Sequence, residues 1–388
     1  MINYLIFLYA FFYSLPLVVI DFLPAGVKLD DVILIFLLVI LIVRMFLSKK
    51  KEVISRGVVL FLLLTLLFST ISLIKSINYF PDQAYGDSGY TVYARILQSL
   101  LIILFVCFLA NRSERTINFF KKGFLLGSTI SLAIFFSYFF ENFNLNTFAS
   151  RGVYFTKDIF QYNPDAPFFV HVNTLGSFFL MSFFLLYDQE KYNIYKVMSF
   201  FFLLPSLLLI AKGDILALFL FFIVNFYQYK RFRVFFYYIL LPISLFLAPV
   251  FYSLYQGLSQ YRVYSSGRDE IYGAAIDSIF NSPFGYGLGV QNEIIFQKIA
   301  INFPAHNILL SVGLELGLIY LFIVILYFFV WFFNHRKAQF QTGIVICYVI
   351  IGLFGNAMYF YKFHTLILAM TMLGIIKGVK KNESRISP

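Results

Sequence analysis

The segment from Arg268 to Gly317 holds the residues of this 388-residue chain that are best suited to chemistry. It contains an arginine, a glycine-rich block from Pro283 to Gly289, and His306 at the start of an apolar run. An arginine guanidinium binds phosphate oxygens through paired hydrogen bonds and stays charged. An imidazole can accept a proton near neutral pH. These residue types predict phosphate binding and proton transfer at one end of a helix.

His306 has a structural and a catalytic interpretation. A lone histidine at an interface is more often a structural hydrogen-bonding group. The adjacent Asn307 and the upstream Arg268 strengthen the catalytic interpretation. Glu315 lies in the same apolar run, where a buried carboxylate needs a partner. We expect Glu315 to pair with a basic residue or to orient a group of the site.

Composition places these residues in an integral membrane protein. The chain is 61% hydrophobic, 21% aromatic and 13% charged, whereas roughly a quarter of the residues are charged in an average soluble domain. Apolar runs near the length of about 20 residues that crosses a bilayer recur about twelve times. Their approximate cores are 4–23, 30–47, 57–77, 93–110, 119–140, 168–187, 196–211, 213–228, 233–256, 306–333, 339–358 and 361–377. We therefore expect an all-α polytopic fold, with residues 1–388 as one membrane domain.

Charge predicts the topology and excludes some partners. Lys and Arg cluster in alternate loops, which by the positive-inside rule places both termini in the cytoplasm. The net charge of +11 is then explained by topology and by contact with anionic membrane lipids, and no motif for nucleic-acid binding is present. Cys107 and Cys347 fall in apolar runs, and the four histidines have no zinc-site spacing. No metal and no cofactor are expected.

Two polar segments, 141–167 and 257–305, fall on the predicted outer side. The second is long for a simple connection. Apolar residues at helical spacing predict a short amphipathic interfacial helix over 272–280, with Arg268 near its start and Asn281-Ser282-Pro283 at its end. The glycines that follow allow the backbone to approach a ligand or another chain segment closely. Ligand contact and simple packing both remain open for these glycines.

Other cations of the outer side extend the predicted phosphate site. Lys212 lies between two apolar runs, where an ion pair with Asp214 at a helix break and a phosphate contact are equally open. Arg151 belongs to the same outer set, and for Arg268 the phosphate contact is favoured. Arg95 and Arg262 are expected to be interfacial anchors or ion-pair partners.

The order of these motifs resembles the O-antigen polymerase and O-antigen ligase family of bacteria. The resemblance covers residues from about 170 to 330. It rests on Asn173 in Val-Asn-Thr-Leu-Gly, on Gly267-Arg268 followed by the glycine block, and on Ala305-His306-Asn307 with Glu315-x-Gly317. The chain departs from the family where Ala211-Lys212 stands in place of a Ser-Arg pair. Lysine keeps the charge there but lacks the two-pronged guanidinium.

The resemblance implies a GT-C-like, metal-independent, inverting glycosyltransferase at the periplasmic face of the bacterial inner membrane. Residues 168–333, including the outer loop 257–305, would form its catalytic half. Its donor would be a glycan on undecaprenyl diphosphate, with Arg268 and Lys212 at the diphosphate and His306 at the acceptor hydroxyl. The resemblance also suggests substrate contacts for Asn173, Asn307, Arg151 and Glu315.

Three assignments of function remain open at this point. A polymerase, which would elongate a lipid-linked repeat unit with a chain-length regulator as protein partner, is favoured. An O-antigen ligase would instead transfer the glycan to lipid A core. A flippase or transporter of lipid-linked oligosaccharide would also have many spans, but transporters often contain two related halves. We find no internal repeat in this chain.

Overall fold

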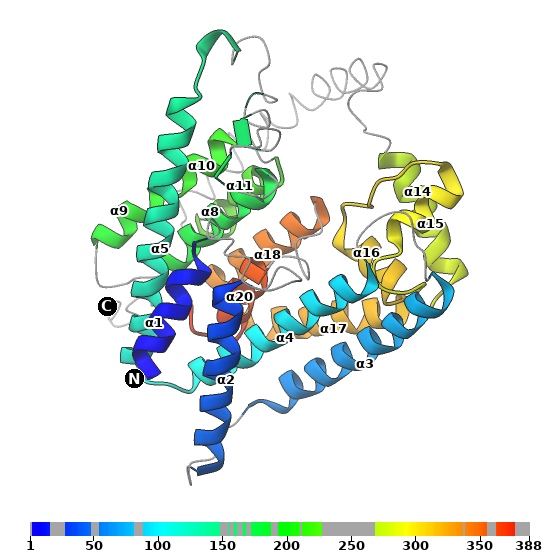
Figure 1. Ribbon diagram of the computed structural model, residues 1–388, viewed down its shortest axis with the longest axis horizontal. Coiled ribbons are helices and arrows are strands. Elements are labelled where there is room, and N and C mark those ends of the chain that lie inside the picture. The colour runs from blue at the N-terminus through cyan, green and yellow to red at the C-terminus, as the bar shows by residue number, and fades with distance from the viewer. Residues whose placement is uncertain are drawn as a thin grey trace, which may run out of the picture.

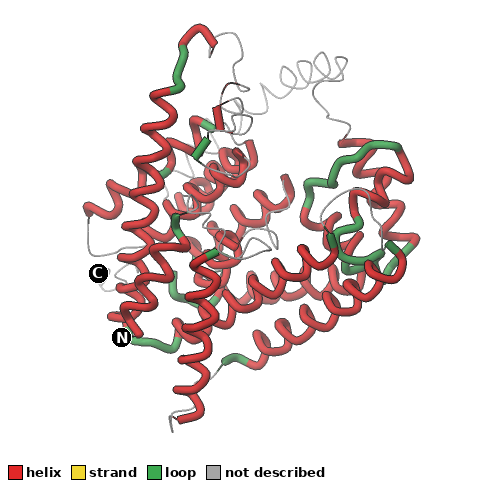
Figure 2. The backbone as a smooth tube through the Cα atoms, viewed as in Figure 1, coloured by secondary structure: helices red, strands yellow, loops and turns green. Residues whose placement is uncertain are grey.

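A computed structural model gives the fold of this chain. It describes residues 2–15, 28–47, 54–80, 88–147, 155, 159–160, 166–167, 172–187, 193–209, 212–226, 268–336, 338–354 and 362–376. The described residues form fifteen helices joined by loops, with no strand among them (Figure 2). The fold class predicted from composition, all-α, is confirmed for this part of the chain. Residues 233–256, Arg151 and Arg262, which carry sequence predictions, lie outside the described residues.

The helices follow one another along the chain with these bounds: α1 Ile2–Tyr13, α2 Leu29–Leu47, α3 Arg56–Tyr79, α4 Gly89–Ala110, α5 Glu114–Glu141, α8 Val172–Tyr187, α9 Asn193–Phe201, α10 Leu203–Leu208, α11 Lys212–Phe226, α14 Arg268–Asn281, α15 Gln291–Ile299, α16 Ile308–Glu315, α17 Leu318–His335, α18 Gln339–Phe354 and α20 Lys362–Met372. Serine side chains cap the N-termini of two of these helices. Ser55 accepts a hydrogen bond from the backbone N–H of Val58 ahead of α3, and Ser88 accepts one from Thr91 ahead of α4. These caps satisfy N–H groups that have no partner inside the helix.

Four of the described helices are long and apolar enough to cross a membrane, namely α3, α4, α5 and α17. Few side chains of α3 and α17 are buried, and many large apolar ones on both helices are exposed. A soluble helix would bury such a face, so this exposure suits helices that contact lipid. Several other predicted spans coincide with shorter apolar helices. The twelve-span topology therefore stays a prediction, and the four helices support only the coarser conclusion of a membrane protein.

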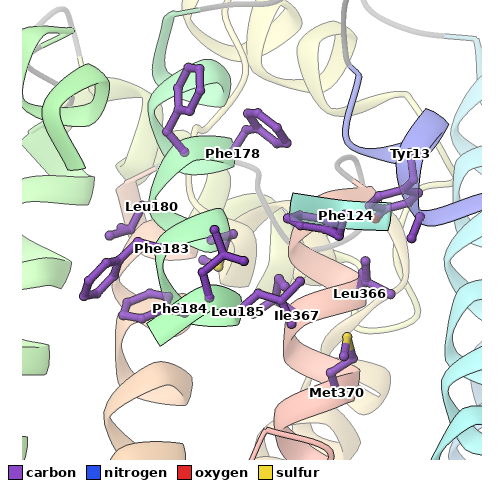
Figure 3. Packing of buried hydrophobic residues seen from close by; sticks show 14 of the residues in the cluster. Tyr13, Phe124, Phe178, Leu180, Phe183, Phe184, Leu185, Leu366, Ile367 and Met370 are labelled. Carbon is purple, nitrogen blue, oxygen red and sulfur yellow. The ribbon is translucent and has the colours of Figure 1, made fainter. Parts of the chain in front are cut away.

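The largest hydrophobic core joins α1, α2, α4, α5, α8, α10, α11, α18 and α20. Figure 3 shows side chains of this core converging from α8, such as Phe183, and from α20, such as Met370. Aromatic pairs fill much of it. Tyr9 of α1 meets Phe105 of α4 with ring centroids 4.9 Å apart, and Phe135 of α5 stacks on Phe160 at 4.8 Å. The high aromatic content of the sequence is thus partly used for packing between helices.

α1 packs along α5 through a face of small residues on α5. Cβ atoms added at Gly123 and Gly127 would collide with the backbone carbonyls of Phe7 and Phe11. Ser131, one turn further on, donates a 2.9 Å hydrogen bond to the carbonyl of Ser14. Small residues spaced four apart allow two membrane helices to approach closely. The approach of these two backbones therefore depends on the absence of side chains on α5.

A second group of helices carries the segment from Arg268 to Gly317. Figure 1 shows α14, α15 and α16 together at the right edge of the molecule, where α3 also ends. One buried cluster joins α14, α15 and α16, and another joins α3, α4, α16 and α17. We call α14–α16 the three-helix unit. Because α16 belongs to both clusters, it connects the three-helix unit to the long apolar helices.

The structure confirms one sequence prediction in this region and corrects another. The helix predicted over 272–280 is present as α14, which begins at Arg268 and ends at Asn281. The apolar run 306–333 was expected to be one helix and is two, because α16 ends at Glu315 and α17 begins at Leu318. The outer loop 257–305 also contains α15, which the sequence did not predict.

The small-residue face of α5 gives a stability prediction. Gly127→Ala should lower the free energy of unfolding by roughly 1–3 kcal/mol, the range for overpacked sites, because the new methyl group meets Phe11 and Ser14. Gly57→Ala in α3 is the matched control, since a Cβ there has nothing within 4 Å. The measurement is an unfolding titration of the purified protein in mixed micelles. Equal stability of the two variants would contradict the close approach of α1 and α5.

Candidate functional site

The glycine block forms a turn between α14 and α15. The backbone of this turn is hydrogen-bonded to the residues at the break between α16 and α17. The N–H of Tyr286 donates to the carbonyl of Leu314 at 2.8 Å, and the N–H of Gly287 donates to that of Glu315 at 3.3 Å. In return, the N–H of Leu318 donates to the carbonyl of Pro283 at 2.7 Å. We call residues 283–289 the glycine turn. Its backbone supplies hydrogen-bond partners to both sides of the helix break.

The last turns of α3 hold the other side of the glycine turn. Lys75 Nζ donates to the carbonyls of Phe284 and Gly285 at 3.0 and 3.1 Å and lies 5.8 Å from the centre of the Phe284 ring. Ser76 Oγ donates to the carbonyl of Leu288 at 2.9 Å, and Ser72 Oγ donates to that of Glu315. Three segments far apart in the sequence therefore meet at this turn.

Sequence reasoning missed the contribution of α3. The signal for it is a stripe of small hydroxyl residues along the apolar helix, at Thr65, Ser69, Ser72 and Ser76, all of them buried. Their spacing of four, three and four residues places them on one face of the helix. Polar residues that recur on one face of an apolar helix indicate contact with another part of the protein. This stripe could have located the neighbour of the glycine turn.

Glycine is required at several points of this contact because backbone meets backbone. Gly285 and Gly317 have φ of 74° and 94°. A Cβ at Gly285 would lie 2.5 Å from the carbonyl oxygen of Glu315, and one at Gly317 would lie 2.5 Å from the carbonyl carbon of Phe284. A Cβ at Gly287 would lie 2.7 Å from the amide nitrogen of Ser76. Of the two uses left open by the sequence, these contacts show close packing against other chain segments.

His306 and Asn307 lie immediately before α16. Asn307 is the N-cap of this helix, and its side-chain oxygen accepts hydrogen bonds from the N–H groups of Leu309 and Leu310 at 3.0 and 3.3 Å. His306 has φ of 47°, in the left-handed region. Its half-buried ring meets Phe303 edge to face at 4.8 Å. Such a backbone conformation at a residue other than glycine costs about 1–3 kcal/mol and is found often at functional sites.

Arg268 is the first residue of α14 and is half buried. α14 packs against both α15 and α16. Gly313 of α16 faces Ile279 of α14, where a Cβ would lie 2.7 Å from the Ile279 side chain. Ile271, one turn after Arg268, shares a buried cluster with Ala305, the neighbour of His306. Arg268 therefore begins one helix, and His306 and Asn307 precede another, that pack against each other.

Glu315 ends α16 and is fully buried. Its carbonyl oxygen accepts the hydrogen bonds from Ser72 and Gly287 described above. The backbone of this residue therefore joins α16 to both α3 and the glycine turn. A contact between its side chain and a substrate stays a prediction.

Asn173 and Lys212 belong to a different part of the fold, in the first turns of α8 and α11. Their side chains lie outside what the structure describes. Ser177 Oγ of α8 donates to Asp214 Oδ1 of α11 at 2.8 Å, so the starts of these two helices lie together. In Figure 1, α8 and α11 are separated from the three-helix unit by α18, which packs against α11 and α16. The predicted site residues therefore fall into two groups.

Comparison with known proteins gives no independent assignment. The chain matches none of the protein-family models with which it was compared. No curated protein matches it either. The resemblance to O-antigen polymerases and ligases therefore stays a prediction that rests on the motifs and their order.

The close contacts of the glycine turn predict that any side chain at these glycines destabilises the fold. Gly287→Ala and Gly317→Ala should each lower stability by roughly 1–3 kcal/mol, because a methyl group would displace backbone and strain a positive φ. Gly273→Ala in α14 is the control, since a Cβ there has nothing within 4 Å. Unfolding in mixed micelles measures the difference. Wild-type stability of both turn variants would rule out the described contact.

The cap of α16 predicts how Asn307 responds to substitution. Asn307→Ala should destabilise the protein by about 1 kcal/mol, whereas Asn307→Asp should stay within a few tenths, because aspartate caps as well as asparagine. Unfolding measurements test this order. If Asn307→Asp keeps the stability but loses the biological activity, the amide has a role in the site besides capping. Equal loss of stability in both variants would contradict the cap.

Proposed function

We propose that this protein is a bacterial surface-polysaccharide polymerase of the O-antigen polymerase and ligase type. It transfers a glycan from undecaprenyl diphosphate to the non-reducing end of a lipid-linked repeat unit. The observation that supports the proposal most is the three-helix unit. His306, in a left-handed backbone conformation, lies just before α16 of this unit, and Arg268 is the first residue of α14, which packs against α16. Both residues belong to the motifs that carry the resemblance.

In the proposed reaction, the acceptor hydroxyl attacks the anomeric carbon of the donor sugar. A carbon–oxygen bond forms on the face opposite the diphosphate, and the bond from the anomeric carbon to the diphosphate oxygen breaks. The imidazole of His306 takes the proton of the acceptor hydroxyl or aligns that hydroxyl. Arg268 stabilises the charge that develops on the leaving undecaprenyl diphosphate. Diphosphate is already a good leaving group, so the step does not demand a general acid.

The four long apolar helices support a location in a membrane. We place the three-helix unit on the periplasmic side of the inner membrane and both termini in the cytoplasm, as the charge pattern predicts. Lys212 and Asn173, at the joined starts of α8 and α11, would contact the substrate from the other side of α18. An O-antigen ligase would use the same site with lipid A core as acceptor.

The backbone at His306 allows a sharp test of its side chain. Because φ is 47°, glycine fits this position without strain, whereas alanine removes the imidazole and keeps the strain. His306→Gly should therefore fold as well as wild type and still lose chain extension by at least tenfold. Arg268→Ala should lose it too. His335→Ala and Lys298→Ala are the controls, because His335 is a histidine outside the three-helix unit and Lys298 is an exposed cation of α15 with no proposed role.

The measurement is the surface-glycan ladder of cells that lack the chromosomal copy and carry one variant, with membrane abundance checked by immunoblot. A single repeat unit on the core with His306→Gly, and a full ladder with the controls, is the expected result. A full ladder with His306→Gly would mean that only the backbone conformation matters. Long polymer that accumulates on undecaprenyl diphosphate in the deletion strain would instead identify a ligase.

A further inference from the structure

A pocket of about 150 Å³ lies between α3, α4, α16, α17, α18 and α20. Its wall is mostly apolar and includes Ile96, Val312, Val324, Ala369 and Met372. An enclosed apolar cavity of this size accepts a hydrocarbon about as large as benzene. This pocket, with its mostly apolar wall, therefore fits a short stretch of hydrocarbon.

Most hydroxyl groups in the wall of the pocket form hydrogen bonds with one another. Six residues of the wall carry hydroxyls, and four of them form two pairs. Thr65 and Tyr320 are hydrogen-bonded at 2.8 Å, and Thr365 donates to Ser99 at 3.3 Å. A hydroxyl that already has a partner gains less from a polar ligand than a hydroxyl without one. The wall therefore offers a ligand chiefly apolar contact.

The helices around the pocket indicate where such a hydrocarbon comes from. α3 and α17 expose large apolar side chains, such as Phe322 at 63% and Phe329 at 59%, and both helices are long enough to cross a membrane. The pocket lies between them and the core and is partly open to its surroundings. Acyl chains are the most abundant hydrocarbon around such helices, so mass action favours them as occupants.

We propose that this pocket binds the end of one acyl chain of a bilayer phospholipid and that the chain supports α16. Ile308, Leu309 and Val312 of α16 line the pocket, while Gly313 faces α14 on another side of the helix. The bound chain and α14 thus hold α16 from two sides. The helix that follows His306 and Asn307 is positioned by lipid as well as by protein. This proposal does not depend on glycosyl transfer.

Photo-crosslinking in the unmodified protein tests the occupant. The protein is reconstituted in vesicles of phosphatidylethanolamine and phosphatidylglycerol that contain a phospholipid with a diazirine near the end of its acyl chain. Labelled residues are then mapped by mass spectrometry. We expect label at Val312 and Ala369, which are only 4% and 7% exposed, in addition to Phe322 and Phe329. Label confined to the exposed residues would overturn the proposal, as would label in the pocket by a polyprenyl-phosphate diazirine alone.

Variants that fill the pocket with a larger side chain test the same proposal in a second way. Ala369→Phe should abolish the label at Val312 and leave the label at Phe322 unchanged. The matched control is Ile325→Phe, because Ile325 is an exposed residue of α17 that does not line the pocket. Elution as a single species in size-exclusion chromatography checks folding, and Val324→Phe is the second filling variant if Ala369→Phe fails that check. Persistent label at Val312 in a folded filling variant would show that no chain occupies the pocket.

Discussion

The backbone from Pro283 to Leu288 lies directly against two other backbone segments, the break between α16 and α17 and the end of α3. Main chain can approach main chain this closely only where no Cβ intervenes, as at Gly285, Gly287 and Gly317. This contact attaches the three-helix unit to two of the long apolar helices. The positions of Arg268 and His306 relative to α3 and α17 therefore depend on it.

The same contact explains how an apolar run can be interrupted. A helix break leaves carbonyl and N–H groups without partners inside the helix, which is costly in an apolar environment. Here Leu314 and Glu315 accept hydrogen bonds from the glycine turn, and Leu318 donates one to it. Ser72 adds a further bond to Glu315. The polar cost of the break is thus offset by groups that the turn and α3 bring to it.

How much could be predicted from the sequence differs from element to element. α14 was predicted because its apolar spacing and its Asn-Ser-Pro end are local signals. The division of 306–333 was missed because the run is apolar throughout, and only Gly317 hints at a break. α15 was missed because it is only nine residues long and several of them are polar. The meeting of Ser177 with Asp214, and of Ser76 with Leu288, depends on tertiary packing, which no local pattern records.

A polymerase joins lipid-linked glycan units itself, without a second enzyme. The direct measurement uses purified protein in phospholipid vesicles, with an undecaprenyl-diphosphate-linked repeat unit added from outside and the lipid-linked products weighed by mass spectrometry. We expect products of two or more repeat units that are absent from vesicles without protein. Repeat units that keep their original mass, and instead become protected inside the vesicles from an added glycosidase, would contradict this expectation and identify a transporter.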